Sequence, residues 1–213
     1  MLKVSRRALL TTAAGAAAGC LVQSPAVLAQ AAPLKLKFGN DLPATHAVNV
    51  RLREAVEAIT AETKGQVEIS LFPNNQLGSD SDMITQLRSG ALELATMPGT
   101  VLSTLIPTAS LTGVGFAFTS YDKVWAAMDG EVGGFIRRNI EKVGLFPFES
   151  VWDNGFRQVT SSTREIRTPD DLKSFKIRVP AAPILTSLFQ ALGAGPTPIN
   201  FNEVYTSLQT KVV

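Results

Sequence analysis

Arginine is the residue type whose placement in this chain points most clearly to a binding site. Arg178 lies near the end of residues 176–179, a run that alternates polar and apolar residues and so predicts a β-strand. Ligands of open α/β sheets lie beyond the carboxyl ends of the strands. The planar guanidinium matches a carboxylate through two parallel hydrogen bonds, and each charge-assisted bond contributes about 1.5–3 kcal/mol. Arg178 is therefore a candidate anchor for an organic anion.

A second arginine and the single histidine are further candidates. Arg157 follows Asn154-Gly155-Phe156 and offers a second donor to the same anion. Taken alone, an arginine is more often solvated or structural than ligand-binding, so this alternative stays open for both arginines. His46 lies in a predicted loop before a helix. It is either a polar loop residue or a hydrogen-bonding group that lines a pocket.

The residue counts exclude several classes of site. One cysteine and one histidine cannot form an intrachain disulfide, a Cys/His zinc site or a two-histidine metalloprotease motif. The chain has no nucleophile elbow and no P-loop, and Gly113-Val114-Gly115 lacks the third glycine of a dinucleotide-binding motif. The net charge of +2 is too balanced to indicate nucleic-acid binding. We therefore expect a binding protein rather than an enzyme, with no cofactor, no metal and no nucleic acid.

Residues 1–29 predict an export signal. Lys3, Arg6 and Arg7 precede the uncharged run 8–22, and small residues follow, with cleavage expected after Ala29. The run is too short and too rich in Ala, Gly and Thr to span about 30 Å of hydrocarbon. The basic start resembles a twin-arginine export signal, and an ordinary secretory signal with two adjacent arginines is the alternative.

Cleavage would change the charge and remove the only cysteine. Three basic residues and no acidic residue precede Gln30, so residues 30–213 carry a net charge of −1 in place of +2. Residues 17–20 also weakly resemble a lipoprotein cleavage box, in which Cys20 would be lipidated and retained. Ala17 stands where a larger aliphatic residue is usual, so the soluble form is favoured.

Strand and helix patterns alternate after the signal, which predicts an α/β fold with a largely parallel sheet. Apolar residues recur with the period of strands or of helices. The first predicted elements are strand 34–38, helix 44–63 ending near Gly65, strand 67–72, helix 80–89 ending at Gly90, and strand 92–97.

The second half of the chain continues this alternation. Its predicted elements are helices 120–128 and 131–143, strand 145–152, a helix starting at Thr168, strand 176–179, helix 184–192 and a last helix from about residue 202. Thr168-Pro169-Asp170-Asp171 has the cap, proline and acidic first turn of a helix start. The last helix has no capping signal by Val213, so we expect the chain to be a fragment of a longer protein.

Several short motifs together resemble the solute-binding proteins of tripartite ATP-independent periplasmic (TRAP) transporters, typified by C4-dicarboxylate-binding members. The most specific motif is Lys176-Ile177-Arg178-Val179-Pro180. The others are Phe38-Gly39-Asn40, His46, Gln76-Leu77-Gly78, Asn154-Gly155-Phe156-Arg157, the run from Asp170 to Phe175, Pro196-Thr197-Pro198 and Leu208-Gln209-Thr210. The family's pattern continues past Val213, which also favours truncation.

The resemblance implies a two-lobed α/β clamshell whose second lobe is incomplete in this chain. Residues 30–150 would form the first lobe, and residues 151–213 would begin the second. Such proteins close on an organic acid in the periplasm and deliver it to a TRAP membrane permease. The implied partners are therefore a small carboxylate and the permease subunits.

The resemblance also implies roles for individual residues. Arg178 would form the salt bridge with the ligand carboxylate, and Arg157 matches a second basic position that faces the pocket. Phe201 matches an aromatic position that packs on the ligand, and a core aromatic is an equally good interpretation. Asp41 and Gly99 match first-lobe positions that touch ligand in relatives.

One departure and two other functions bear on this hypothesis. Ala181 stands where sialic-acid-binding relatives tend to carry Asn, which favours a smaller or less polar carboxylate. An exported enzyme acting on a small organic acid is one alternative, and the lack of a paired base and nucleophile argues against it. A lipid-anchored interaction protein is the other, and an acylated Cys20 would support it.

Overall fold

The computed structural model describes residues 32–213, in which Pro33–Val213 form one compact unit. The predicted export signal, its cleavage site after Ala29 and Cys20 lie outside the described residues. Among residues 32–213, no helix has both the length and the apolar character needed to cross a membrane.

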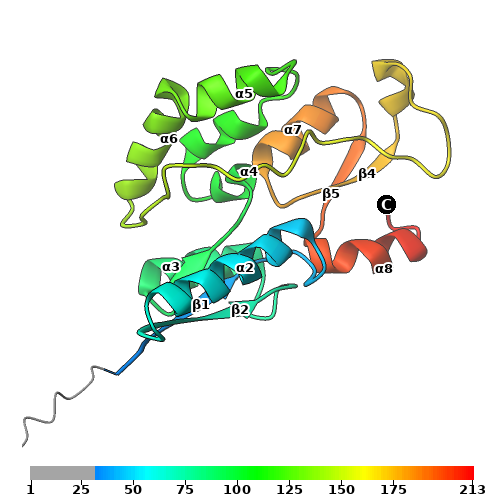
Figure 1. The fold of residues 1–213 in the computed structure, drawn as a ribbon. Coiled ribbons are helices and arrows are strands. Elements are labelled where there is room, and N and C mark those ends of the chain that lie inside the picture. The colour runs from blue at the N-terminus through cyan, green and yellow to red at the C-terminus, as the bar shows by residue number, and fades with distance from the viewer. Residues whose placement is uncertain (1–31) are drawn as a thin grey trace, which may run out of the picture. The chain divides into compact units, whose positions relative to one another are not determined.

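The first half of this unit is built on a parallel sheet with the strand order β2-β1-β3. The alternating strand and helix predictions for residues 34–89 are confirmed (Figure 1). Strand β3 is shorter than the predicted 92–97, because it pairs only with Phe38 and Gly39 of β1. The elements are β1 (Leu34–Gly39), α2 (Ala47–Glu62), β2 (Val67–Phe72), α3 (Asp80–Ser89) and β3 (Leu94–Ala95).

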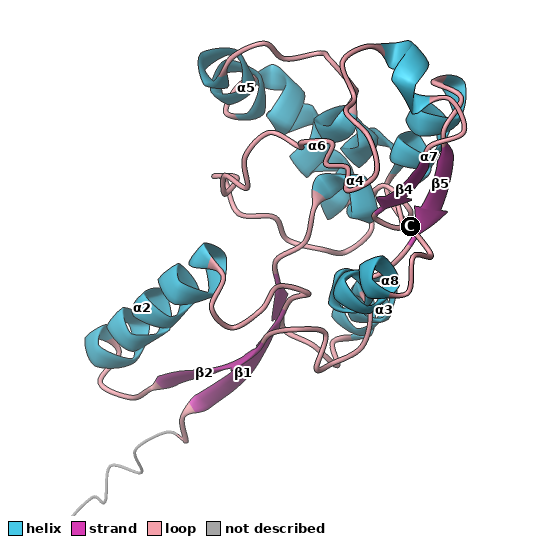
Figure 2. Ribbon diagram, turned by 90° about the vertical axis from the view of Figure 1, so that its right-hand side faces the viewer, coloured by secondary structure: helices cyan, strands magenta, loops and turns pink. Residues whose placement is uncertain are grey.

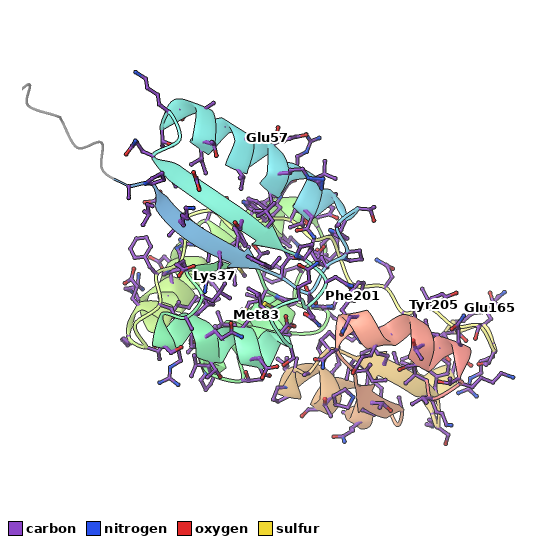
Figure 3. All side chains as sticks on the ribbon, turned by 90° about the horizontal axis from the view of Figure 1, so that it is seen from below. Lys37, Glu57, Met83, Glu165, Phe201 and Tyr205 are labelled. Carbon is purple, nitrogen blue, oxygen red and sulfur yellow. The ribbon has the colours of Figure 1, made fainter. Side chains whose placement is uncertain are left out.

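Helices α2 and α3 lie on opposite sides of this sheet (Figures 2 and 3). The strand order requires this arrangement, because each parallel crossover is right-handed and the two run in opposite directions along the sheet. Met83 of α3 is fully buried beneath β1 (Figure 3). A Cβ on Gly39 would lie 2.8 Å from the Met83 sulfur, so any larger residue at this position would force the buried Met83 side chain to shift.

A helical layer follows the sheet. Its core consists of Ile106, Ala109, Met128 and Ile136, which are all buried. The predicted helices 120–128 and 131–143 are confirmed, with the second ending slightly earlier. The layer contains α4 (Gly99–Leu102), the 3-10 helix η1 (Pro107–Gly113), α5 (Tyr121–Met128) and α6 (Glu131–Glu141).

A second, two-stranded parallel sheet pairs β4 with β5. Helix α7 connects the two strands, and Val179, Ala182 and Leu185 form their small core. The predicted strand 176–179 and helix 184–192 are confirmed. The elements are β4 (Lys176–Val179), α7 (Pro183–Ala191), β5 (Gly195–Pro198), the 3-10 helix η3 (Phe201–Glu203) and α8 (Val204–Gln209).

Two predicted elements in the segment between the layers are wrong. Residues 145–152 contain no strand, because no other strand of the described chain lies alongside to take their backbone hydrogen bonds. Phe146 and Phe148 are therefore 85% and 70% exposed. The helix start at Thr168 gives only a single 3-10 turn, η2 (Pro169–Leu172), since Ser174 adopts a positive φ of 60° soon after it.

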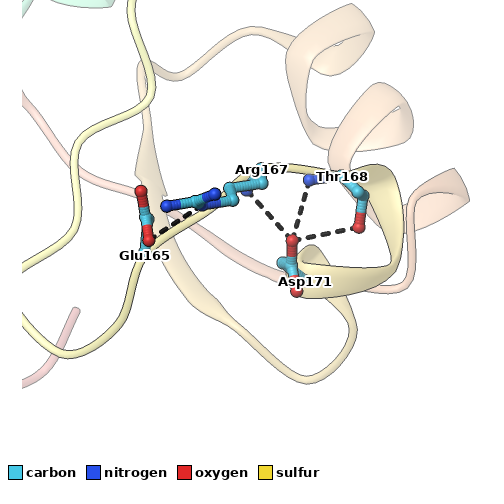
Figure 4. A network of polar contacts seen from close by, with 4 residues as sticks. All are labelled: Glu165, Arg167, Thr168 and Asp171. Carbon is cyan, nitrogen blue, oxygen red and sulfur yellow. Dashed lines mark hydrogen bonds and ion pairs between the residues drawn. The ribbon is translucent and has the colours of Figure 1, made fainter.

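The turn η2 is held by one carboxylate (Figure 4). Oδ2 of Asp171 accepts hydrogen bonds from the backbone N–H groups of Arg167 and Thr168 at 3.0 and 2.7 Å, and from the Thr168 hydroxyl at 3.0 Å. The same bonds lower the pKa of Asp171. The acidic residue that predicted a helix here thus caps one turn.

The last helix also differs from the prediction. It begins as the 3-10 turn η3, and α8 then ends at Gln209 rather than continuing to the last residue. Thr210 caps it through its backbone N–H, and Lys211 has a left-handed φ of 58°. The predicted lobe boundary near residue 150 stays a prediction.

Candidate functional site

Arg178 is held firmly at the end of β4. Its Nε and Nη2 both donate to the backbone carbonyl of Ile199, at 2.9 and 2.7 Å. Ile199 directly follows β5, whose pairing with β4 ends at Val179 and Pro198. Two of the five guanidinium N–H groups are thereby used, and three remain for another acceptor. The guanidinium group of Arg178 is therefore fixed at the end of the sheet and still has N–H donors for another acceptor.

Phe201 lies next to this guanidinium. The Cζ atom of Arg178 is 5.7 Å from the centre of the Phe201 ring, which is the geometry of a cation–π contact. The ring is 39% exposed, so it is not a core aromatic. Figure 3 shows Phe201 at the start of the segment that continues to Tyr205 in α8.

Two carboxyl groups from the first half of the unit lie near enough to Arg178 to feel its charge. Asp41 follows β1 and is only 8% exposed, and Asp80 is the first residue of α3. Burial raises the pKa of Asp41, while its own backbone N–H and the charges of Arg178, His46 and Arg157 oppose the rise. Burial also raises the pKa of Asp80 to about 7, with the charge of Asp41 adding and that of Arg178 opposing.

Arg157 completes the cluster from the irregular segment. Its Nη2 lies 3.4 Å from the hydroxyl of Thr100, which is buried at the start of α4. Arg157 is an exposed residue as a whole, and its guanidinium group is partly buried where it meets Thr100. This burial lowers its pKa, and the charge of Asp41 opposes the change. The pKa of Arg178 is lowered first by burial and then by the charge of Arg157.

Arg157, Arg178, Asp41 and Asp80 are near enough for their charges to affect one another's pKa values. They form no direct ion pair with one another. The direct ion pairs of residues 32–213 all lie elsewhere, and none includes Arg157, Arg178, Asp41 or Asp80. Two partly desolvated guanidinium groups with unused donors form a strong site for a carboxylate, because charge-assisted hydrogen bonds are stronger away from water. The geometry therefore suits capture of an anion.

A buried amide pair positions the loop that carries Asp41. The Asn40 Nδ2 donates to the Asn49 Oδ1 at 2.7 Å, and the Asn49 Nδ2 donates back at 3.1 Å. Asn49 also donates to the carbonyls of Leu42 and Pro43, at 3.0 and 2.9 Å. Both asparagines are almost fully buried, so helix α2 fixes the backbone on either side of Asp41.

His46 and Gly99 have clear structural roles. The Nδ1 of His46 accepts from the Val48 N–H at 3.2 Å and so caps α2. His46 borders a cavity of about 760 Å³ whose walls include Trp125 and Trp152 but none of the four charged groups. A Cβ on Gly99 would lie 2.5 Å from the Thr112 hydroxyl, so packing accounts for this glycine.

Sequence reasoning missed Asp80, Thr100 and one contact between distant segments. The Asn75 Nδ2 donates to the Asn202 Oδ1 at 2.9 Å, across 127 positions of sequence. Asp80 follows Ser79, the N-cap of α3. An acidic residue is common at the start of a helix, so the sequence pattern gives no reason to assign Asp80 to a binding site. Within residues 32–213, no group of three His, Cys, Asp or Glu side chains is arranged to hold a metal ion.

Sequence comparison places the chain among solute-binding proteins. Residues 38–213 match the family described as bacterial extracellular solute-binding protein, family 7. The chain is 32% identical over 178 residues to the 2,3-diketo-L-gulonate-binding periplasmic protein of Escherichia coli, covering 84% of this chain and 54% of that protein. It is 28% identical over 208 residues to the C4-dicarboxylate-binding periplasmic protein of Rhodobacter capsulatus, covering 97% and 61%.

Solved structures show the same fold. A TRAP periplasmic solute-binding protein from a Sulfitobacter species with bound β-D-galacturonate superposes with a TM-score of 0.80 at 27% identity, covering 84% of this chain and 59% of that one. One from Sulfurospirillum deleyianum with bound succinate gives 0.78 at 29%, covering 85% and 58%. The chain thus spans little more than half the length of these relatives. The expected α/β fold of two-lobed binding proteins is confirmed, and the chain belongs to family 7 of the bacterial extracellular solute-binding proteins.

Proposed function

We propose that this protein captures a small organic acid in the periplasm and delivers it to a TRAP-type membrane permease. The observation that carries the proposal is the convergence of Arg178 and Arg157, each partly desolvated and neither in a direct ion pair, at the end of β4. The ligand carboxylate takes the donors of Arg178 that Ile199 leaves free. Arg157 supplies the second cation.

The remaining site residues take supporting roles in this proposal. Phe201 packs on the apolar face of the ligand, beside the guanidinium of Arg178. Asp41 borders the ligand from the loop after β1, with His46 near enough for its charge to act on Asp41. The Gly99 backbone lies beside Thr100, which contacts Arg157. Residues 30–150 and 151–213 contribute to separate lobes, and export is followed by cleavage after Ala29.

The ligand class follows from the chemistry of the site. Two guanidinium groups recognise a carboxylate, and nothing in the cluster supplies a nucleophile beside a base, so the protein binds its ligand without converting it. Relatives are named for, or solved with, a diketo sugar acid, galacturonate and succinate, which all carry a carboxylate. A small carboxylate is the class that we assign to this chain.

The test is ligand binding by the full chain and by arginine variants. Isothermal titration with D-galacturonate, D-galactonate and succinate is expected to show binding, and the ligand is expected to raise the melting temperature by mass action. Arg178→Ala should weaken binding about 10- to 150-fold, the equivalent of 1.5–3 kcal/mol for a lost charge-assisted bond. Arg178→Lys keeps the charge but loses the planar fork, so it should recover only part of the affinity.

The matched control is Arg167→Ala. Arg167 is exposed and pairs with Glu165 at 2.9 Å (Figure 4), and it is not among the groups whose charges act on Arg178 or Arg157. It should bind like the unaltered chain, and circular dichroism of each variant checks folding. Unchanged affinity in a folded Arg178→Ala protein, or no binding of any carboxylate by the unaltered chain, contradicts the proposal.

A further inference from the structure

Asp80 carries a buried carboxylate oxygen that no hydrogen-bond donor in residues 32–213 reaches. This atom, Oδ1, is closed off from solvent at the first turn of α3. An ionised oxygen without a donor is costly in such a place, because its hydration is lost and nothing replaces it. A neutral carboxyl group avoids most of this cost. The position therefore favours a protonated Asp80.

The charged groups around Asp80 come from three elements. Asp41, from the loop after β1, adds negative charge, and Arg178, from β4, adds the positive charge that favours ionisation. On α3 itself, Asp82 belongs to the exposed capping box and Arg88 lies at the opposite end of the helix. Of the other elements against α3, β3 and α4 contain no titratable residue. Strand β1 contributes Lys35, which pairs with Glu68, and Lys37, which donates to the carbonyl of Ala91. Arg178 is thus the cation that keeps Asp80 ionisable.

A bound carboxylate would change this balance. With both aspartates ionised, the charges of Arg157, Arg178, Asp41 and Asp80 cancel, so an incoming anion leaves one net negative charge in a partly desolvated site. The anion also engages Arg178, which then compensates Asp80 less. Protonation of one carboxyl group restores neutrality, and Asp80 is the group whose oxygen has no donor.

We propose that Asp80 takes up a proton when the protein captures a carboxylate at Arg178 and Arg157, so that ligand affinity is linked to pH. This inference rests on the function proposed above. Protonation of Asp80 would relieve the net negative charge that the bound anion creates in the site.

The linkage has a definite sign. Free Asp80 titrates at about 7, and the complex must titrate at a higher pH if binding takes up a proton. Affinity should be constant below about pH 6, where both states hold the proton. Above pH 7 it should fall by up to about tenfold per pH unit, until the complex also loses the proton.

The test counts protons during binding by the full chain. Titration calorimetry at pH 8 in buffers of different ionisation enthalpy, with D-galacturonate and separately with succinate as the probe, should show uptake of more than about half a proton per ligand. Asp80→Asn should bind with no proton uptake and with affinity that does not change between pH 6 and 8. Asp41→Asn should reduce the uptake, because it removes one of the four charges that the bound anion unbalances. Asp122→Asn, which alters an exposed residue of α5, should retain the uptake.

The outcomes separate this inference from the function on which it rests. Binding without proton uptake overturns the inference alone, and so does uptake that persists in Asp80→Asn. Proton release with galacturonate also overturns it, because Asp80 would then accept a hydrogen bond from a ligand hydroxyl group. Absence of binding at every pH, in both the unaltered chain and Asp80→Asn, overturns the proposed function itself.

Discussion

At the scale of single residues, one arginine illustrates how the fold restricts a flexible side chain. Arg178 has a long stem with considerable rotamer freedom, yet two of its N–H groups are fixed on the Ile199 carbonyl. A ligand therefore meets a guanidinium that is already oriented, and less side-chain entropy is lost on binding. The ring of Phe201 lies beside the same guanidinium group and further restricts its movement.

The pH dependence of stability should reveal the raised pKa of Asp80. A carboxyl group titrates near 4 in an unfolded chain, whereas Asp80 titrates at about 7 in the folded protein. The folded state therefore binds more protons between pH 4 and 7, and the free energy of unfolding should fall as the pH rises through this window. After allowance for solvent screening, Asp80→Asn should be more stable than the unaltered chain by about 1–3 kcal/mol at pH 8.

Chemical denaturation at pH 5 and pH 8 measures this difference. Asp122→Asn, on the exposed side of α5, is the control and should keep the pH dependence of the unaltered chain. Identical pH dependence for Asp80→Asn and the unaltered chain would show that Asp80 titrates normally.

Gly99→Ala should destabilise the protein through packing. The added Cβ would meet the Thr112 side chain at 2.5–3.2 Å, and that hydroxyl is already bonded to the Ala109 carbonyl at 2.8 Å. We expect a loss of about 1–3 kcal/mol in the free energy of unfolding. Gly134→Ala is the control, because its Cβ would meet only the flexible end of Arg138 at 3.3 Å. Equal stabilities for the two variants, by urea denaturation, would refute the packing role of Gly99.

At the scale of elements, α2 does more than cover the sheet. Its N-terminus is capped by His46, and Asn49 in its first turn bonds the loop that carries Asp41. The helix thus fixes the loop that places Asp41 on one side of the site. The opposite side depends on the pairing of β4 and β5, which brings Ile199 under Arg178.

Asn49→Leu tests the role of this helix. The substitution leaves the amide of Asn40 and the carbonyls of Leu42 and Pro43 without their partner in a buried place. We expect a loss of about 1–3 kcal/mol in the free energy of unfolding. Val50→Ala, at an exposed position of the same helix, should change stability by less than about 0.5 kcal/mol.

The same variant should also weaken carboxylate binding, because the Asp41 loop loses its fixed position. Titration with D-galacturonate, at a temperature where circular dichroism shows the variant folded, separates the two effects. A folded Asn49→Leu protein with unchanged affinity and stability would show that the amide pair does not position the site.

At the scale of the whole described unit, the site is assembled from segments far apart in sequence. Two sheets supply Asp41 and Arg178, and the irregular segment between η2 and α6 supplies Arg157. That segment has no strand or helix from residue 145 to residue 168, and Arg157 is held there only by a 3.4 Å contact with Thr100. It is the least restrained part of the cluster.

Ligand binding should therefore order this segment. Saturating D-galacturonate is expected to slow amide hydrogen exchange in residues 154–159 by about tenfold or more, since opening would require release of the bound carboxylate. Exchange measured by mass spectrometry checks this, with α2 residues as the internal reference. Arg157→Ala should abolish the protection. Equal protection in that variant would show that Arg157 does not bind the ligand.

Elements whose patterns are local could be predicted from the amino-acid sequence. The strands 34–38, 67–72 and 176–179 and the helices 80–89 and 184–192 were predictable, because apolar period and capping residues act over a few positions. Arg178 could be singled out for the same reason, from its place at a strand end. Arg157 was a candidate from its place after Asn154-Gly155-Phe156, whereas Asp41 and Phe201 were implied only by the family resemblance.

Which groups share one site, and which predicted elements fail to form, depends on the packing of distant segments. Residues 145–152 read as a strand but stay irregular, since a strand exists only with a neighbour to pair with. Asp80 read as a helix-start residue, and its desolvation beside Asp41 and Arg178 arises from burial by segments distant in sequence. Burial and charge proximity are properties of the packed chain, so no local pattern can predict them.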